Sequence, residues 1–144
     1  MAGSVVVVTL TRRSDTLSEE LWNGEPPGYT PVMWLMTTVG FFSIVRKGEE
    51  TDLTVRARVR EDLEALEKEY LPSLGPIIAG GGTDYPYRAR VDSKALAAAI
   101  ARMVEDIDYT NFKDTTAARQ GMERAHVYGE VWSALRKLTS EAQP

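Results

Sequence analysis

The sequence predicts an α+β fold in which an antiparallel sheet carries its helices on one face. Two observations lead to this class. The phrase Arg-Ala-Arg-Val occurs twice, at residues 56–59 and 88–91. In both copies apolar and charged residues alternate, which is typical of a strand with one buried face. A run with helical spacing follows each copy, so the sequence predicts a duplicated ββα unit in a two-layer sandwich of the ferredoxin-like class, completed by a long C-terminal helix.

The composition is that of an ordinary globular chain. It has 144 residues, of which 43% are hydrophobic and 26% charged, and this length is typical of a single domain. There is no cysteine, which excludes disulfides and thiolate sites and suits a cytoplasmic location. The apolar run at residues 5–10 is too short to span a membrane. A formal net charge of -4 argues against bulk attraction to nucleic acid.

Residues 1–31 are expected to be an accessory segment. The run of β-branched residues at 5–10 predicts a strand. Thr16 and Glu19 have capping-box spacing and predict a short helix over 17–22. The Pro26-Pro27 pair then predicts a rigid connector. We therefore expect the strand to add to an edge of the sheet, and the rest of the chain to fold without this segment.

Residues 32–110 contain the predicted core, beginning with an apolar stretch over 32–47. Gly40 divides that stretch, which predicts either a hairpin turning at 38–40 or one long strand with a bulge. Phe41 or Phe42 is expected in the core. A strand over 53–59 then leads into a helix over 61–70, which ends before Pro72.

The second unit repeats this plan. A short strand over 77–79 and the glycines at 80–82 lead to a strand over 85–91. Asp92 and Ser93 are suited to cap the next helix. The middle of the chain therefore has the order ββαββα. Residues 111–144 are expected to form one helix beginning at Asp114 or Thr115. Its apolar stripe would consist of Met122, Ala125, Tyr128, Trp132, Leu135 and Leu138.

Residues suited to catalysis or metal binding are few. His126 is the only histidine, and a metal site or hydrolytic triad built on it would lack histidine and cysteine partners. Asp106 and Asp108 are the remaining metal candidates, and they are more simply the acidic end of a helix. A strand follows the triple glycine, whereas a phosphate loop needs a helix there, so a hairpin turn is favoured. We expect no metal and no cofactor.

The arginines of the repeat form the main candidate site. In both copies they point away from the face that the helices cover, so Arg56, Arg58, Arg88 and Arg90 would share the open sheet face, with Trp34 and Tyr85 as neighbours. Buried unpaired charges are costly, so this face must be wet, salt-bridged or bound to an anionic partner. Three interpretations remain: a solvated face, a protein interface, and a nucleotide or nucleic-acid site.

Several short motifs between residues 33 and 138 resemble a family of small uncharacterised bacterial proteins. These motifs are Met33-Trp34, Gly40-Phe41-Phe42-Ser43-Ile44-Val45, Val55-Arg56-Ala57-Arg58-Val59, Ile107-Asp108-Tyr109 and Asn111-Phe112-Lys113. The resemblance covers most of the chain, leaves residues 1–32 outside it, and implies no particular activity.

We expect a non-enzymatic binding or accessory protein that uses its arginine-rich sheet face. Its partner would be another protein or a second copy of the chain in a homodimer, with an anionic ligand as a further option, and no membrane is involved. One alternative is a module that binds nucleotides or single-stranded nucleic acid. The other is a small enzyme that depends on carboxylates, tyrosine and arginine.

Overall fold

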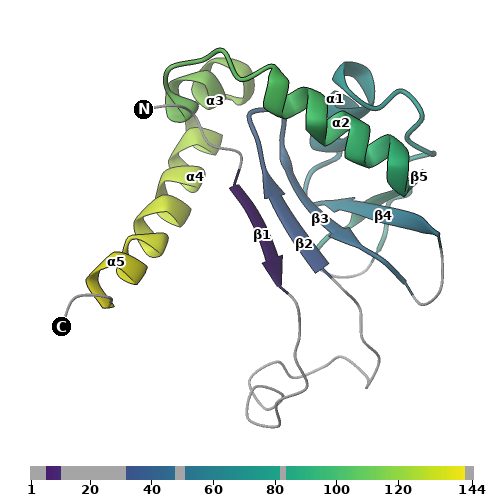
Figure 1. The fold of residues 1–144 in the computed structure, drawn as a ribbon, viewed down its shortest axis with the longest axis horizontal. Helices are drawn as coiled ribbons and strands as arrows, with labels where there is room; N and C mark the ends of the chain where they lie inside the picture. Colours follow the sequence, from purple (N-terminus) through teal and green to yellow (C-terminus); the bar gives the residue numbers. More distant parts are fainter. Residues whose placement is uncertain (1–5, 11–31, 48–50, 82–83, 142–144) are drawn as a thin grey trace, which may run out of the picture.

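The computed structural model describes residues 6–10, 32–47, 51–81 and 84–141. Its centre is a five-stranded antiparallel sheet whose strand order follows the chain, β1-β2-β3-β4-β5. The strands are β1 (Val6–Leu10), β2 (Val32–Met36), β3 (Phe41–Val45), β4 (Asp52–Ala57) and β5 (Tyr87–Asp92). Figure 1 shows β1 at one edge of the sheet. The α+β class and the antiparallel sheet are therefore confirmed.

A tight turn joins β2 to β3, so the hairpin is the correct one of the two predicted alternatives. The Thr37 hydroxyl donates to the Gly40 carbonyl oxygen and accepts hydrogen bonds from the Val39 and Gly40 amides. Such side-chain bonds replace ladder bonds where the backbone reverses. Gly40 is required for space, because a Cβ there would lie 2.7 Å from Cβ and Cγ of Asp62.

Helices α1 (Arg60–Glu69) and α2 (Ser93–Glu105) cover one face of the sheet. Both helices contribute to one hydrophobic core with the strands, which confirms that they pack on the same face. The side chains in this core from the sheet and its turn are Leu35, Val39, Phe42, Ile44, Val55, Ala57, Ala89 and Val91. Those from the two helices are Leu63, Leu66, Leu96, Ala99 and Met103. Asp92 caps α2 as expected, because its carboxylate accepts from the Lys94 and Ala95 amides.

The C-terminal segment is divided into α3 (Phe112–Gln120), α4 (Met122–Leu135) and α5 (Lys137–Glu141). The long C-terminal helix is therefore present as α4, but it does not start at Asp114 or Thr115. Asn111 caps α3, and Gly121 ends it with a positive φ of 95°. A left-handed residue interrupts helical hydrogen bonding, which explains why the expected single helix is broken here.

The ferredoxin-like duplication is not confirmed. Helix α1 connects β4 to β5, and these strands are adjacent and antiparallel. A split βαβ unit would instead join parallel strands with another strand between them. The short strand expected over 77–79 is reduced to one bridge, Ile78 with Arg88. The predictions for residues 16–27 lie outside the described residues.

Candidate functional site

The pairing of β4 with β5 brings the two copies of the repeated phrase together. Arg56 lies directly opposite Arg88, and Arg90 lies opposite Thr54. Because the strands are antiparallel, Arg58 and Arg90 extend in opposite directions from the central pair. Residues two apart on a strand are separated by roughly 7 Å. The repeat therefore produces a row of arginines that crosses from one strand to the other.

Aromatic rings continue this row. The guanidinium carbon of Arg56 lies 4.7 Å from the Tyr85 ring centroid, and that of Arg58 lies 5.1 Å from it. Arg58 is also 5.9 Å from the Phe41 ring, which meets Trp34 edge-to-face at 6.2 Å. Guanidinium groups at such distances are attracted to aromatic faces. We name this surface the arginine face: Trp34, Phe41, Ser43, Arg56, Arg58, Tyr85, Arg88 and Arg90.

Two of the four arginines are less exposed than the sequence predicts. Arg58 and Arg90 are exposed, whereas Arg56 and Arg88 are half-buried. Arg56 donates to the Ser43 hydroxyl over 2.7 Å, and Arg88 donates to the Gly81 carbonyl oxygen over 3.2 Å. Arg90 approaches Asp52 at 3.8 Å. The central pair, Arg56 and Arg88, is therefore on the predicted face but partly buried, because these local acceptors hold it.

Phe41 and Ser43 are members of the arginine face that the sequence did not identify. Phe42 and Ile44 belong to the core, and alternation turns Phe41 and Ser43 to the other side. The strand alternation was readable, but the position of Ser43 beside Arg56 depends on the β3–β4 register. Tyr85, by contrast, is a predicted neighbour, and it lies beneath the guanidinium groups with only 7% of its surface exposed.

An ion pair between buried Asp62 and partly buried Arg124 joins the sheet and α1 to α4. The Asp62 carboxylate accepts from Arg124 at 2.8 Å and from the Phe41 amide at 3.0 Å. Arg124 also donates to Gln120 and to the Tyr128 hydroxyl. Burial lowers the pKa of Arg124, but hydrogen bonding to Asp62 and Tyr128 together with their electrostatic attraction outweighs burial and raises that pKa. Burial raises the pKa of Tyr128. The network borders a hollow of about 400 Å3.

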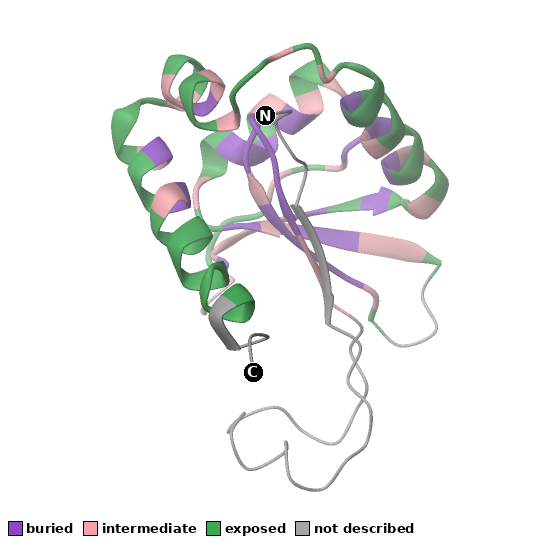
Figure 2. Cartoon of the chain, turned by 60° about the vertical axis from the view of Figure 1, so that its left-hand side comes forward, coloured by how far each residue is buried: buried purple, intermediate pink, exposed green. Residues whose placement is uncertain are grey.

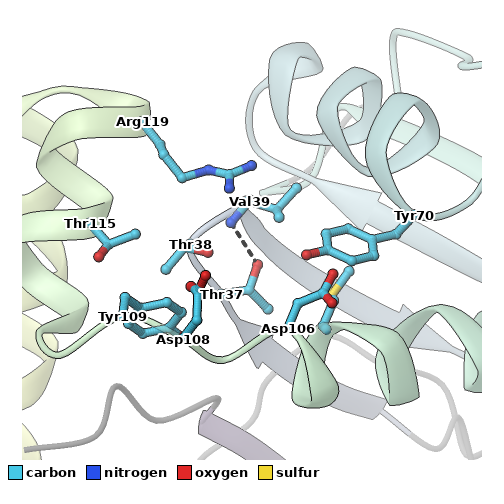
Figure 3. A pocket seen from close by; sticks show the side chains of 10 residues that line it. Thr37, Thr38, Val39, Tyr70, Asp106, Asp108, Tyr109, Thr115 and Arg119 are labelled. Atoms are coloured by element: carbon cyan, nitrogen blue, oxygen red, sulfur yellow. Dashed lines mark hydrogen bonds between the residues drawn. The ribbon is translucent and has the colours of Figure 1, made fainter.

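A second pocket of about 80 Å3 lies where the β2–β3 turn meets the ends of α1 and α2 and the side of α3. Figure 3 shows Tyr70 and Tyr109 on opposite sides of it. Burial and then Asp106 raise the pKa of Tyr70, and burial and then Asp108 raise the pKa of Tyr109. Both hydroxyls therefore remain protonated at neutral pH and act as donors rather than bases.

Sequence reasoning missed this pocket, although it considered Asp106 and Asp108 for metal binding. The part of the chain that the structure describes contains no group of three or more acidic or histidine side chains placed to hold a metal ion. His126, the other metal candidate, is exposed on α4. No local motif marks the pocket, because its residues come from elements that only the tertiary fold brings together.

The apolar stripe expected on the last helix is buried only near its start. Ala125 and Tyr128 are buried, and Tyr128 stacks on Phe112. The other four members, Met122, Trp132, Leu135 and Leu138, are exposed. Figure 2 shows that exposed residues predominate along α4. The stripe is helical as predicted, but packing partners for its C-terminal half are absent from the described residues.

Comparisons with known proteins add no evidence on the function of this chain. No protein-family model matches the chain, and neither a curated protein nor a solved structure matches it. The resemblance to small bacterial proteins therefore stays a prediction. Within the described residues, every helix is too short or too polar to cross a membrane.

Proposed function

We propose that this protein binds another protein through the arginine face. The observation that supports the proposal is a continuous series of contacts. Arg56 and Arg58 lie over the Tyr85 ring, and Phe41 lies between Arg58 and Trp34. Tryptophan, tyrosine and arginine are the residues that most often dominate the binding energy of protein interfaces. Their rings and guanidinium groups are already in contact, so less side-chain entropy is lost on binding.

The charge of this face favours an acidic partner. Arginine makes bidentate contacts with carboxylates, and exposed Arg58 is placed to do so, while exposed Arg90, 3.8 Å from Asp52, adds to the positive charge of the face. Self-association of two arginine faces would bring like charges together, which costs free energy. A heterologous protein with surface carboxylates therefore fits better than a homodimer formed through this surface.

A nucleotide or single-stranded nucleic acid is the second candidate, because a row of arginines beside aromatic rings resembles a stacking platform. Two features favour the protein partner instead. The Tyr85 ring is covered by two guanidinium groups, which leaves little of it for a base. Neither of the two pockets above includes a residue of this face, whereas nucleotide sites are concave.

The test replaces only the two exposed arginines. The double variant Arg58→Glu with Arg90→Glu should fold normally, because it spares the bonds of Arg56 and Arg88, and the ion pair of Arg90 with Asp52 that it removes is exposed to solvent. The matched control, Lys94→Glu with Lys113→Glu, makes the same charge change at exposed positions on α2 and α3. Proteins captured from cell extract are identified with the wild type and both variants, and each candidate is then purified and titrated calorimetrically.

We expect a partner whose Kd rises at least tenfold with the arginine variant and stays unchanged with the control. Retention of every captured protein by the arginine variant would contradict the proposal. Preferential binding of a single-stranded oligonucleotide, with a Kd that rises steeply with salt and is lost in the same variant, would establish the second candidate instead.

A further inference from the structure

The pocket between Tyr70 and Tyr109 has a lining with net negative charge. Asp106 and Asp108 contribute two carboxylates. Arg119 is the only basic residue among the described residues that line it, and its guanidinium is paired with the Glu69 carboxylate. The positive charge of Arg119 is therefore already compensated, while the two aspartates leave an excess of negative charge.

The backbone adds to the negative potential in the pocket. Helix α1 ends at Glu69 and α2 at Glu105, so Tyr70 and Asp106 are the C-cap residues of these helices. Both C-cap residues line the pocket. The C-terminal end of a helix carries a partial negative charge that favours cations within about one turn. The end of α2 and the two carboxylates therefore attract the same kind of ligand. The end of α1 already has a cation, because Arg102 donates to the Tyr70 carbonyl oxygen and its guanidinium lies 6.0 Å from the Tyr70 ring centroid.

Thr38 adds a hydrogen-bonding side chain to the lining of the pocket. Its side chain lines the pocket although the residue is only 9% exposed. Within the described residues its hydroxyl makes no hydrogen bond, whereas the hydroxyl of adjacent Thr37 is fully used in the turn. Figure 3 shows Thr38 close to Asp108, between the two tyrosines. This hydroxyl can therefore accept a hydrogen bond from the N–H group of a ligand in the pocket.

The same features distinguish an organic cation from a metal ion. The described residues offer no group of three or more acidic or histidine ligands. Aromatic rings on opposite sides, in contrast, suit an ammonium group, which ring faces attract. A volume of about 80 Å3 equals that of roughly two to three waters, enough for an ammonium head and a short alkyl stem.

We propose that this pocket binds an alkylammonium group, supplied either by a small free amine or by a lysine side chain of another protein. The ammonium lies between the carboxylates of Asp106 and Asp108 and donates to the Thr38 hydroxyl. The rings of Tyr70 and Tyr109 flank it. This site is separate from the arginine face, and neither proposal depends on the other.

The first experiment titrates the full-length protein with n-butylammonium and follows the Thr38, Tyr70 and Tyr109 resonances by NMR. We expect a saturable shift of these resonances at millimolar concentration. n-Butanol, which has the same stem without the charge, and butyrate, which has the opposite charge, should not saturate the pocket. Equal binding of n-butanol, or the absence of any saturable shift with n-butylammonium, would overturn the proposal.

Substitutions of the pocket residues test whether n-butylammonium binds there. Asp106→Asn and Asp108→Asn should each weaken n-butylammonium binding at least tenfold. The control Glu105→Gln removes one charge from an exposed neighbouring residue outside the lining and should leave binding unchanged. If Asp106→Asn fails to fold because Tyr70 loses its partner, then Asp108→Asn and Thr38→Val complete the test. Folded variants that bind as tightly as the wild type would contradict the site.

A second ligand separates the two sources of the ammonium group. Nα-acetyl-lysine methylamide carries the same head and stem on a peptide backbone. Binding as tight as that of n-butylammonium identifies a protein lysine as the natural occupant, and binding of n-butylammonium alone identifies a small free amine. The Arg58→Glu, Arg90→Glu variant should bind n-butylammonium normally, so failure of one proposal leaves the other testable.

Discussion

Asp62 shows how one side chain joins three parts of this molecule. Its carboxylate binds Arg124 of α4 and the Phe41 amide at the start of β3, while its own backbone lies in α1. It is also packed against Gly40, where a Cβ would have to displace it. The carboxylate therefore satisfies a buried charge and a backbone donor at once.

Replacing Asp62 by alanine should lower the free energy of unfolding by about 3–5 kcal/mol, because the partly buried Arg124 guanidinium would lose its carboxylate. Urea denaturation measures this change. The control is Glu64→Ala, which removes an exposed partner of Arg60 and should cost less than about 1 kcal/mol. A similar small effect at both positions would show that Asp62 does not hold α4 in place.

The sequence revealed these residue-level features unevenly. The arginines were predictable, because alternation along a strand assigns each residue to a face. The partnership of Asp62 with Arg124 was not, since 62 positions separate them and neither lies in a recognisable motif. The half-buried state of Arg56 and Arg88 also depends on acceptors, Ser43 and Gly81, that only the folded chain supplies.

At the scale of elements, the two glycines of the C-terminal segment have opposite roles. Gly121 lies between α3 and α4 with a φ of 95°, whereas Gly129 lies inside α4. At both positions the space around an added Cβ is open among the described residues. The backbone conformation alone therefore decides what an alanine does.

We expect Gly129→Ala to stabilise the protein by about 0.5–1 kcal/mol, because glycine weakens a helix interior. Gly121→Ala should destabilise it by about 1–2 kcal/mol, because alanine is strained in the left-handed region. Thermal or urea unfolding of the two single variants provides the comparison, and each serves as the control for the other. Destabilisation by both substitutions would contradict the helical conformation of Gly129.

Most elements could be predicted from the sequence, but the break at Gly121 and the state of residues 77–79 could not. Periodicity identified the strand before each helix and both core helices, and Gly40 indicated a hairpin at 38–40 as one of two alternatives. The break at Gly121 was missed because glycine is compatible with a weak helix as well as with a helix end, and only φ distinguishes them. Residues 77–79 have strand composition, yet they form only one bridge, since pairing depends on how the loop meets β5.

For the whole molecule, the expectation that residues 1–31 are an accessory segment can now be made specific. The segment contains β1, which lies at the sheet edge and pairs only with β2 among the described strands. The core side chains whose burial is described come from β2–β5, the turns and loops between elements, α1 and α2. Removal of the segment would leave the apolar strand Val32–Met36 as the new edge.

Deleting residues 1–31 should therefore preserve a cooperative thermal transition but increase self-association, because an exposed apolar edge strand templates pairing with other chains. Differential scanning calorimetry tests the first expectation, and size-exclusion chromatography over a range of concentrations tests the second. Loss of the cooperative transition would show that β1 is an essential part of the sheet.

The sequential order of the strands also determines when each surface can form as the chain folds. Contacts between neighbours in sequence form fastest, and the β2–β3 hairpin requires only a four-residue reversal at 37–40. The β4–β5 pair must wait until the intervening chain, with α1, has been placed. The arginine face exists only once that pair has closed. We therefore expect partly folded chains to lack the recognition surface, so that a partner would encounter it only on molecules that have completed their sheet.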